Sequence, residues 1–188
     1  MMRRYLYPPL LVWCGFFVMI SLGIAGAPPS ADSEPSGFKG TVAAHNVWRQ
    51  AVSAPDMAWS NTLAATAQEW ANFLASPKGG CRLEHRPRKG KHARPFGENL
   101  YQAFSSPKPP QLSPKEVVDA WGGESENYDA NTHTCSPGKV CGHYTQMVWR
   151  DTRFVGCGMT ACQTNNFHAI IWVCNYDPYG NIVGQYPF

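Results

Sequence analysis

Two histidines and two glutamates are the side chains whose types and surroundings could support chemistry in this chain. Each lies in a short segment that is otherwise apolar or bounded by glycine: His85 in CRLEHRP, Glu98 in FGENLY, Glu124 in WGGESENY and His143 in GHYTQMVW. Two imidazoles and two carboxylates can form a zinc or other transition-metal site with open positions. They can equally form a network in which each histidine donates a hydrogen bond to a glutamate. The spacing leaves both alternatives open, because the four come from different segments and no H-E-x-x-H pair occurs.

Other common kinds of catalytic centre are not indicated. The sequence has no G-x-S-x-G segment for a serine nucleophile and no glycine-rich loop that would hold a phosphate. Glu98 and Glu124 could supply the carboxylate pair of a glycoside hydrolase, but the sequence locates no groups that would stack on a sugar. We therefore expect a binding protein, and a metal-dependent hydrolase that uses the same four residues is the alternative.

The first 27 residues have the features of a secretory signal peptide. Two arginines precede the apolar run LLVWCGFFVMISLGIA, which is followed by further small residues. Pro28 disfavours cleavage directly before it, so we predict a cut after Ala25, with a cut after Ala27 as second choice. The run is shorter than the roughly 20 residues that a membrane span needs. We therefore expect a secreted, extracellular protein without a membrane anchor, in a cell wall or periplasm depending on the organism.

Loss of this leader would leave a nearly neutral chain. The 188 residues carry a formal charge of +3, and the leader holds two arginines and no acidic residue, so the remainder carries +1. Such a chain is a poor candidate for binding nucleic acid through its phosphates. The basic segment HRPRKGKHAR at 85–94 is a local exception, and we expect it to be a solvated loop.

The cysteines of the exported chain form an even set. Cys14 leaves with the leader, and six cysteines remain. They are Cys81, Cys135, Cys141, Cys157, Cys162 and Cys174. An even number in an exported chain predicts three disulfides. A zinc site built on cysteines would need close C-x-x-C pairs, which the sequence lacks.

The register of a predicted hairpin indicates which cysteines pair. RFVGCGMTAC and HAIIWVCNY are rich in β-branched and aromatic residues and are joined by QTNNF, which predicts two antiparallel strands. Counting back from the turn brings Cys157 opposite Cys174, whereas Cys162 lies at an odd interval and points to the other face. Cys162 then pairs with Cys81 if the remaining two cysteines close their short loop. We predict the pairing 81–162, 135–141 and 157–174, one of the fifteen that six cysteines allow.

A linker and several helices precede this hairpin. Residues 28–37, PPSADSEPSG, show no apolar periodicity, and we predict a disordered linker there. The first helix then has Arg49 on the same face as His45 or Asn46. We predict helices from Phe38, over 60–76, from Pro114 to about Glu126 and over 143–148, with loops at 81–97 and 105–113. Helices first and strands last indicate one α+β domain, residues 38–188, with helices packed on an antiparallel sheet.

Several segments resemble the CAP superfamily, which comprises cysteine-rich secretory proteins, insect venom antigen 5 and pathogenesis-related class 1 proteins of plants. AAHNVWRQAV and MAWSNTLAATAQEWAN are similar to its first two helices, and FGENLY to its GENL segment. Trp121 and Glu124 supply the following W-x-x-E. CGHYTQMVWRDTRFVGCGMTAC is similar to the first signature motif and VCNYDPYGNIVGQYPF to the second. The resemblance covers nearly all of residues 39–188 and is closest to plant class 1 and related short bacterial members.

The resemblance implies a three-layer α-β-α sandwich with a central cavity lined by a tetrad, His85, Glu98, Glu124 and His143. His92 lies in the long loop between the first two and is a rival for the first position, but C-x-L-x-H favours His85. Some members bind zinc or another divalent ion through the two histidines. His85 and His143 are therefore candidate ligands of Zn²⁺, although no cofactor is required.

Members of this superfamily bind sterols or fatty acids, inhibit microbes or act as venom toxins. We therefore expect a secreted, monomeric, non-enzymatic defence protein that binds a small apolar ligand, such as a sterol or fatty acid. A metal-dependent hydrolase is one alternative. The other is a peptide precursor, because PYGNIVGQYPF at 178–188 resembles a segment that plants release as a defence signal.

Overall fold

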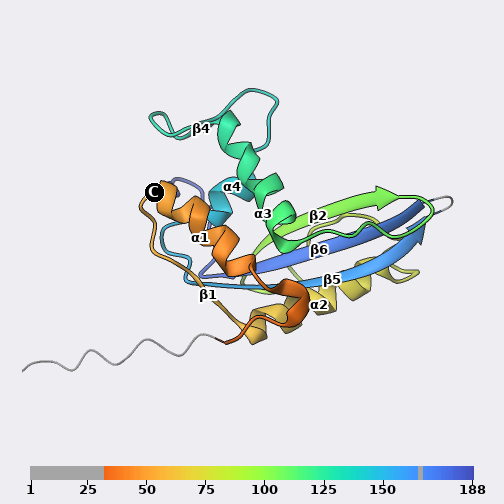
Figure 1. Ribbon diagram of the computed structural model, residues 1–188. Helices are drawn as coiled ribbons and strands as arrows, with labels where there is room; N and C mark the ends of the chain where they lie inside the picture. The colour runs from red at the N-terminus through yellow and green to blue at the C-terminus, as the bar shows by residue number, and fades with distance from the viewer. Residues whose placement is uncertain (1–31, 165–166) are drawn as a thin grey trace, which may run out of the picture. The chain divides into compact units, whose positions relative to one another are not determined.

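Four strands form the sheet on which the helices pack (Figure 1). Their order is β1 (Ala58–Trp59), β5 (Phe154–Thr164), β6 (Phe167–Asp177) and β2 (Gly97–Ser105). β5 and β6 form the predicted antiparallel hairpin. β2 pairs with β6 in antiparallel and the short β1 pairs with β5 in parallel, so the sheet is mixed. β2 was not predicted, because its sequence lacks a clear alternation of apolar and polar residues.

The computed structural model describes residues 32–164 and 167–188. The predicted signal peptide, with its cleavage sites after Ala25 and Ala27, lies outside the described residues. No helix within the two described ranges combines the length and the apolar character that crossing a membrane requires.

Helices cover the two faces of the sheet and give the three layers that the resemblance implied (Figure 1). α2 (Asn61–Ala75) packs on one face, where its residues join Leu100, Ile171 and Val173 in one core. α1 (Thr41–Ala51), α3 (Pro114–Gly122) and α4 (Gly142–Met147) contribute to a second core on the other face. The residues of that core include Ala44, Val117, Trp121, Met147, Trp172, Cys174 and Tyr176.

Local sequence signals explain where the helices begin. The Ser60 side chain accepts a hydrogen bond from Leu63 N at the start of α2. Ser113 and Glu116 form a capping box at the start of α3, and Pro114 occupies its first turn. After α3 the chain continues as a short 3-10 helix, η2 (Gly123–Asn127), so the predicted helical stretch to about Glu126 is present in two parts. A two-stranded ribbon of β3 (Tyr128–Asp129) and β4 (Thr134–Cys135) follows.

The predicted disulfides are confirmed: 81–162, 135–141 and 157–174. Cys157 and Cys174 are direct partners in the β5–β6 ladder and belong to the core beneath α1 and α3. Cys162 packs against the core on the α2 side, so it lies on the opposite face, as its odd interval predicted. There it meets Cys81, which follows α2.

Residues 32–37, the described part of the predicted linker, contact the domain through two acidic side chains. The Glu34 carboxylate accepts hydrogen bonds from Gly40 N and Val42 N, at 2.8 and 2.6 Å, at the start of α1. Asp32 accepts one from Asn61 N at the start of α2. The first amides of a helix lack partners within the helix and favour negative charge, so acidic side chains attach this segment to the domain.

Candidate functional site

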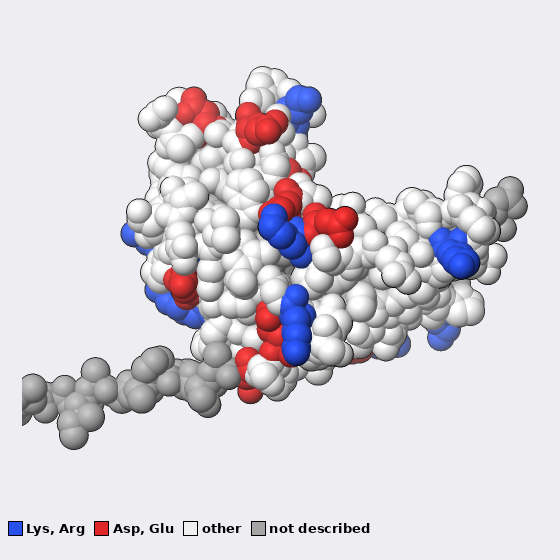
Figure 2. All heavy atoms as spheres, in the orientation of Figure 1, with Lys and Arg blue, Asp and Glu red and all other residues white. Residues whose placement is uncertain are grey.

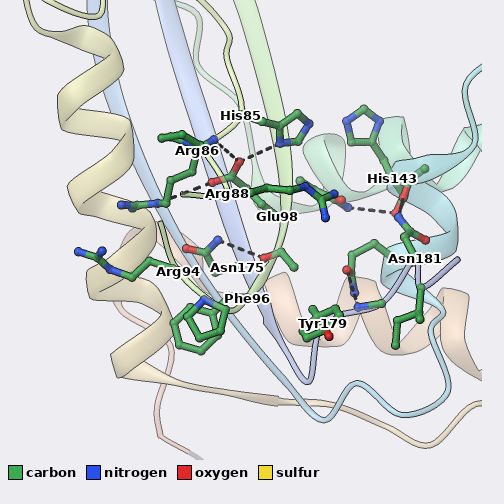
Figure 3. A pocket seen from close by; sticks show the side chains of 18 of the residues that line it. His85, Arg86, Arg88, Arg94, Phe96, Glu98, His143, Asn175, Tyr179 and Asn181 are labelled. Carbon is green, nitrogen blue, oxygen red and sulfur yellow. Dashed lines mark hydrogen bonds and ion pairs between the residues drawn. The ribbon is translucent and has the colours of Figure 1, made fainter. Parts of the chain in front are cut away.

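A cleft of about 840 Å³ opens between the loop that follows α2, the start of α4 and the C-terminal segment (Figure 3). His85, Glu98 and His143 line it. Its other lining residues include Arg86, Arg88, Arg94, Phe96, Asn175, Tyr179, Ile182 and Val183. Figure 3 shows Arg86 and Arg94 on the side of α2, and Tyr179 and Asn181 on the opposite side. Glu124 does not line the cleft but lies against His143.

The first histidine–glutamate pair joins the loop after α2 to strand β2. His85 Nδ1 donates to Glu98 Oε1 at 2.8 Å, and Arg86 N donates to the same oxygen at 3.0 Å. The Glu98 side chain is 9% exposed, whereas that of His85 is 62% exposed. The carboxylate of this pair is therefore buried and its imidazole faces solvent.

The second pair joins η2 to the first turn of α4. His143 Nδ1 donates to Glu124 Oε1 at 2.6 Å, and the backbone amides of His143 and Tyr144 donate to Oε2 at 3.0 and 3.2 Å. The His143 ring stacks on Trp121, with centroids 6.1 Å apart. Glu124 thus serves as the N-terminal cap that α4 otherwise lacks.

Both histidines use Nδ1 to contact a glutamate, which leaves Nε2 for the cleft. A carboxylate on Nδ1 fixes the tautomer whose Nε2 lone pair can bind a metal, and metal-binding histidines commonly have such a partner. The donor chemistry therefore fits a divalent ion held by His85 and His143. Across the described residues, however, no three His, Cys, Asp or Glu side chains gather into a metal-binding group. An ion held there would take its remaining ligands from water or from a bound molecule.

A chain of buried hydrogen bonds runs from α1 to the backbone of His143. Asn99 Nδ2 donates to the His143 carbonyl at 3.0 Å and to the Tyr176 hydroxyl oxygen at 3.2 Å. The Tyr176 hydroxyl donates to His45 Nε2 at 2.9 Å, and His45 Nδ1 donates to the Thr41 carbonyl at 2.8 Å. Burial lowers the pKa of His45 to about 4 and raises that of Tyr176, so both are neutral near pH 7.

Arg49 is a fully buried cation that holds the segment following α4. It donates to the carbonyl oxygens of Pro55, Met147, Trp149 and Thr152 at 2.6 to 2.9 Å. Burial lowers its pKa to about 10, which still leaves it charged near pH 7. The sequence placed Arg49 on the same helix face as His45 but gave no sign that its charge is buried.

The C-terminal segment forms one wall of the cleft. Gly180 N donates to Gln146 Oε1 at 2.9 Å, and Asn181 Nδ2 donates to the Gly142 carbonyl at 2.8 Å. Arg150 N donates to the Pro187 carbonyl at 2.6 Å. A Cβ on Gly180 would come within 3 Å of the Trp149 ring, so only glycine permits this approach. The predicted peptide 178–188 is therefore attached to α4 and the turn after it.

The two candidate histidines of the basic loop occupy different places. His85 contacts Glu98, whereas His92 lies against Phe73 and 3.9 Å from Glu69. The expected solvated loop is partly packed, because the Arg86 guanidinium lies 4.9 Å from the Trp70 ring centroid. Burial lowers the pKa of Arg86. An amphipathic arginine can cover an aromatic ring while it pairs with carboxylates, which the local sequence does not reveal.

Among the polar residues of the site that were not predicted are Arg86, Asn99 and Asn175. Asn99 follows Glu98 directly, so in a strand it must point to the other face, where it meets the His45 network. A strand assignment over FGENLY would have indicated that division. Asn175 could be found only through the register, which pairs it with Glu98.

The fold and the cleft define a class: a disulfide-linked α-β-α sandwich that carries two histidine–glutamate pairs. The chain belongs to the CAP family, the cysteine-rich secretory protein family, whose family model matches residues 42–176. It is 38% identical to a pathogenesis-related protein of PR-1 type from Sambucus nigra, over 94% of this chain and 97% of that protein. It is 43% identical to the basic form of pathogenesis-related protein 1 from Nicotiana tabacum, over 77% and 71%.

Solved structures show the same fold at lower sequence identity. Venom allergen-like protein 4 of Schistosoma mansoni aligns with a TM-score of 0.60 and 22% identity, over 82% of this chain and 95% of that one. NaASP2, solved with Zn²⁺, aligns with a TM-score of 0.58 and 23% identity, over 87% and 90%. The recognised family and the three-layer architecture are thereby confirmed.

Proposed function

We propose that this chain is an extracellular defence-type protein that acts by binding a small amphipathic ligand in the cleft, without catalysis. The observation that carries the proposal is the lining of the cleft. Polar groups such as Arg86, Glu98 and Asn175 line it together with apolar side chains such as Phe96, Ile182 and Val183. A volume of about 840 Å³ lies within the range of small-molecule sites. A sterol or a fatty acid has both parts, a polar head and an apolar body.

Three disulfides support an extracellular location, because they persist in oxidising compartments.

The charge on the surface supports a small ligand in place of a nucleic acid. On the face of the described residues seen in Figure 2, Lys and Arg are interspersed with Asp and Glu and form no broad area of one sign. Nucleic-acid binding would call for a basic stripe or patch.

Saturable uptake of a labelled sterol and a labelled fatty acid by the purified protein tests the ligand proposal. We expect one of the two to bind stoichiometrically. Val183 is fully exposed and lines the cleft, so Val183→Asp should weaken that binding. Val47→Asp makes the same change on an exposed side chain of α1 outside the cleft and should have no effect. A lack of saturable uptake for both ligands would contradict the proposal.

We also propose that His85 and His143 hold a divalent ion such as Zn²⁺ through their Nε2 atoms. Calorimetric titration with zinc should show uptake at micromolar concentration. His85→Ala or His143→Ala should each weaken it at least about tenfold, as expected on losing one of two protein ligands. His168→Ala removes a histidine of β6 outside the cleft and is the control. If the wild type binds no zinc, both this site and the alternative of a metal-dependent hydrolase are wrong.

The alternative, a peptide precursor, predicts that the C-terminal segment is released from the domain. Release of residues 178–188 would remove Gly180, Asn181 and Val183 from the cleft wall. Mass spectrometry of the protein recovered from its native source distinguishes the two, because a binding protein keeps this segment and a precursor loses it.

A further inference from the structure

Three buried polar atoms on the α2 side of the cleft have no hydrogen-bond partner among the described residues. They are Arg86 Nε, Glu98 Oε2 and Asn175 Oδ1, and all three residues line the cleft. Arg86 is 8% exposed, Asn175 is 2% exposed and the Glu98 side chain is 9% exposed. Buried polar atoms nearly always have a partner from the protein, water or a ligand. Three such atoms beside one cleft therefore indicate a group that is bound there.

The register of the sheet brings these atoms together. Glu98 on β2 and Asn175 on β6 are direct partners, so their side chains lie on the same face of the sheet. Arg86 reaches that face from the loop after α2, and its Nε lies 4.0 Å from Glu98 Oε2. That separation is too long for a hydrogen bond between the two atoms. Figure 3 shows the three side chains close to one another beside the cleft.

The free positions consist of one donor and two acceptors. Glu98 Oε1 already accepts from His85 and Arg86 N, which leaves Oε2. Asn175 Nδ2 donates to the Gly97 carbonyl at 3.1 Å, which fixes the amide with Oδ1 unpaired. Arg86 donates through NH1 and NH2 to the carbonyls of His92 and Thr66, which leaves Nε.

We propose that Arg86, Glu98 and Asn175 form a hydroxyl-binding subsite, so that the ligand of the cleft is an alcohol and not a carboxylic acid. A hydroxyl can donate to Glu98 Oε2 or Asn175 Oδ1 while it accepts from Arg86 Nε. A carboxylate has no hydrogen to give to these acceptors and is repelled by Glu98. The Arg86 charge does not change this preference, because Glu69 lies 3.5 Å from its guanidinium and Glu98 lies on its other side.

This inference rests on the proposed function of the cleft. Three probes that share one alkyl chain and differ in their polar head group test the binding function and the hydroxyl subsite separately. The probes are 1-decanol, decanoate and decylammonium, each titrated calorimetrically below the concentration at which it aggregates. We expect 1-decanol to bind at least about tenfold more tightly than decanoate, because one probe satisfies the buried atoms and the other does not. In NMR spectra of the ¹⁵N-labelled protein, 1-decanol should shift the Arg86 Nε–H signal.

A matched pair of variants tests the acceptor directly. Glu98→Gln exchanges an acceptor for a donor in the subsite, and we expect it to weaken 1-decanol about tenfold and to strengthen decanoate. Glu84→Gln makes the same change in an exposed residue that does not line the cleft, and it should leave both affinities unchanged. Thermal unfolding checks that both variants are folded, and the wild-type titrations do not depend on either.

The outcomes distinguish the two proposals. If none of the three probes binds, the cleft is not an amphipathic binding site and the proposed function itself is wrong. If the probes bind and decanoate equals or exceeds 1-decanol, the hydroxyl subsite is wrong, and the three atoms hold an ordered water only. Binding of 1-decanol without any shift of the Arg86 Nε–H signal would also overturn the inference.

Discussion

The Glu124–His143 pair and the His85–Glu98 pair contain the same two kinds of side chain, but the protein holds them in different ways. Glu124 caps α4 by accepting hydrogen bonds from two backbone amides, and the His143 ring stacks on Trp121. His85 lies on a loop and its side chain is mostly exposed. Among the described residues its ring has one hydrogen-bond partner, Glu98. One histidine is therefore positioned by a helix and a core, and the other by a single contact.

This difference suggests how the cleft would accommodate the proposed ligand. The part of the cleft around His143, the His143 half, is preorganised. The backbone carbonyl of His143 accepts a hydrogen bond from Asn99, which belongs to a buried network with Tyr176 and His45. On the His85 half, the Glu98 carboxylate still has one unpaired buried oxygen. Adjustment on binding should therefore concentrate at His85 and its loop, while His143 stays in place.

The disulfides beside the two halves should differ most in their contribution to stability. Cys81 lies four residues before His85 and pairs across a separation of 81 residues, whereas Cys141 lies two before His143 and pairs across six. In the chain-entropy account, replacing both cysteines of the first bridge by serine costs about 4.5 kcal/mol of unfolding free energy, and of the second about 2 kcal/mol. Urea denaturation measures both. Equal costs would show that loop entropy does not decide the difference.

Acid should lower the stability of the protein through protonation of His45, in the network that holds His143. The pKa of His45 falls from 6.5 to about 4 on folding because the ring is buried, so the unfolded chain binds more protons between these values. Its contribution to stability is fully present above pH 6.5 and is lost as the pH falls towards 4, a total of about 3 kcal/mol. Urea denaturation from pH 7 to pH 4 measures this loss.

His45→Gln is the control for that titration. Glutamine can still accept from the Tyr176 hydroxyl but has no charge to gain, so the variant should lose about 3 kcal/mol less than the wild type between the two pH values. Hydrogen exchange should show that α4 becomes less protected in the wild type on acidification. If both proteins lose the same stability, His45 does not carry the pH dependence.

The smallest difference in stability is expected between variants of two β2 side chains, one bonded to the backbone of each half of the cleft. Asn99 Nδ2 donates to the His143 carbonyl, and Gln102 Nε2 donates to the Cys81 carbonyl, both at 3.0 Å. Asn99 is buried and also contacts Tyr176, so Asn99→Leu should cost about 2 kcal/mol, and Gln102→Leu about 1 kcal/mol. A larger loss of stability for Gln102→Leu than for Asn99→Leu would contradict the comparison, because it would show that the loop carrying His85 is held more firmly than His143.

The elements that sequence analysis predicted are those with strong local or periodic signals. α2 begins at a serine cap, and α3 begins at a capping box, where the sequence placed them. The hairpin alternation fixed which face each cysteine occupies, and the disulfides followed from that count. β1 and β2 have no comparable signal, because their strand state depends on pairing with β5 and β6.

The candidate site likewise has features that the sequence predicted and features that it did not. The four residues of the tetrad were predicted from their types and from the resemblance. The structure joins them in two pairs, and all except Glu124 line the cleft. Their binding role stays a prediction. Burial of the Arg49 and Arg86 charges was not predicted, because carbonyl groups and an aromatic ring from distant segments surround them.

The sequence by itself determined the starts of α2 and α3, the set of six cysteines that pair, the family and the residue types that could bind a ligand or a metal. These depend on neighbours within a few positions or on alternation along one strand. Only the tertiary structure decided that His85 and not His92 meets Glu98. It also decided that Asn175 lies beside that carboxylate. Such contacts depend on the register of strands and the packing of layers, which join residues far apart in the chain.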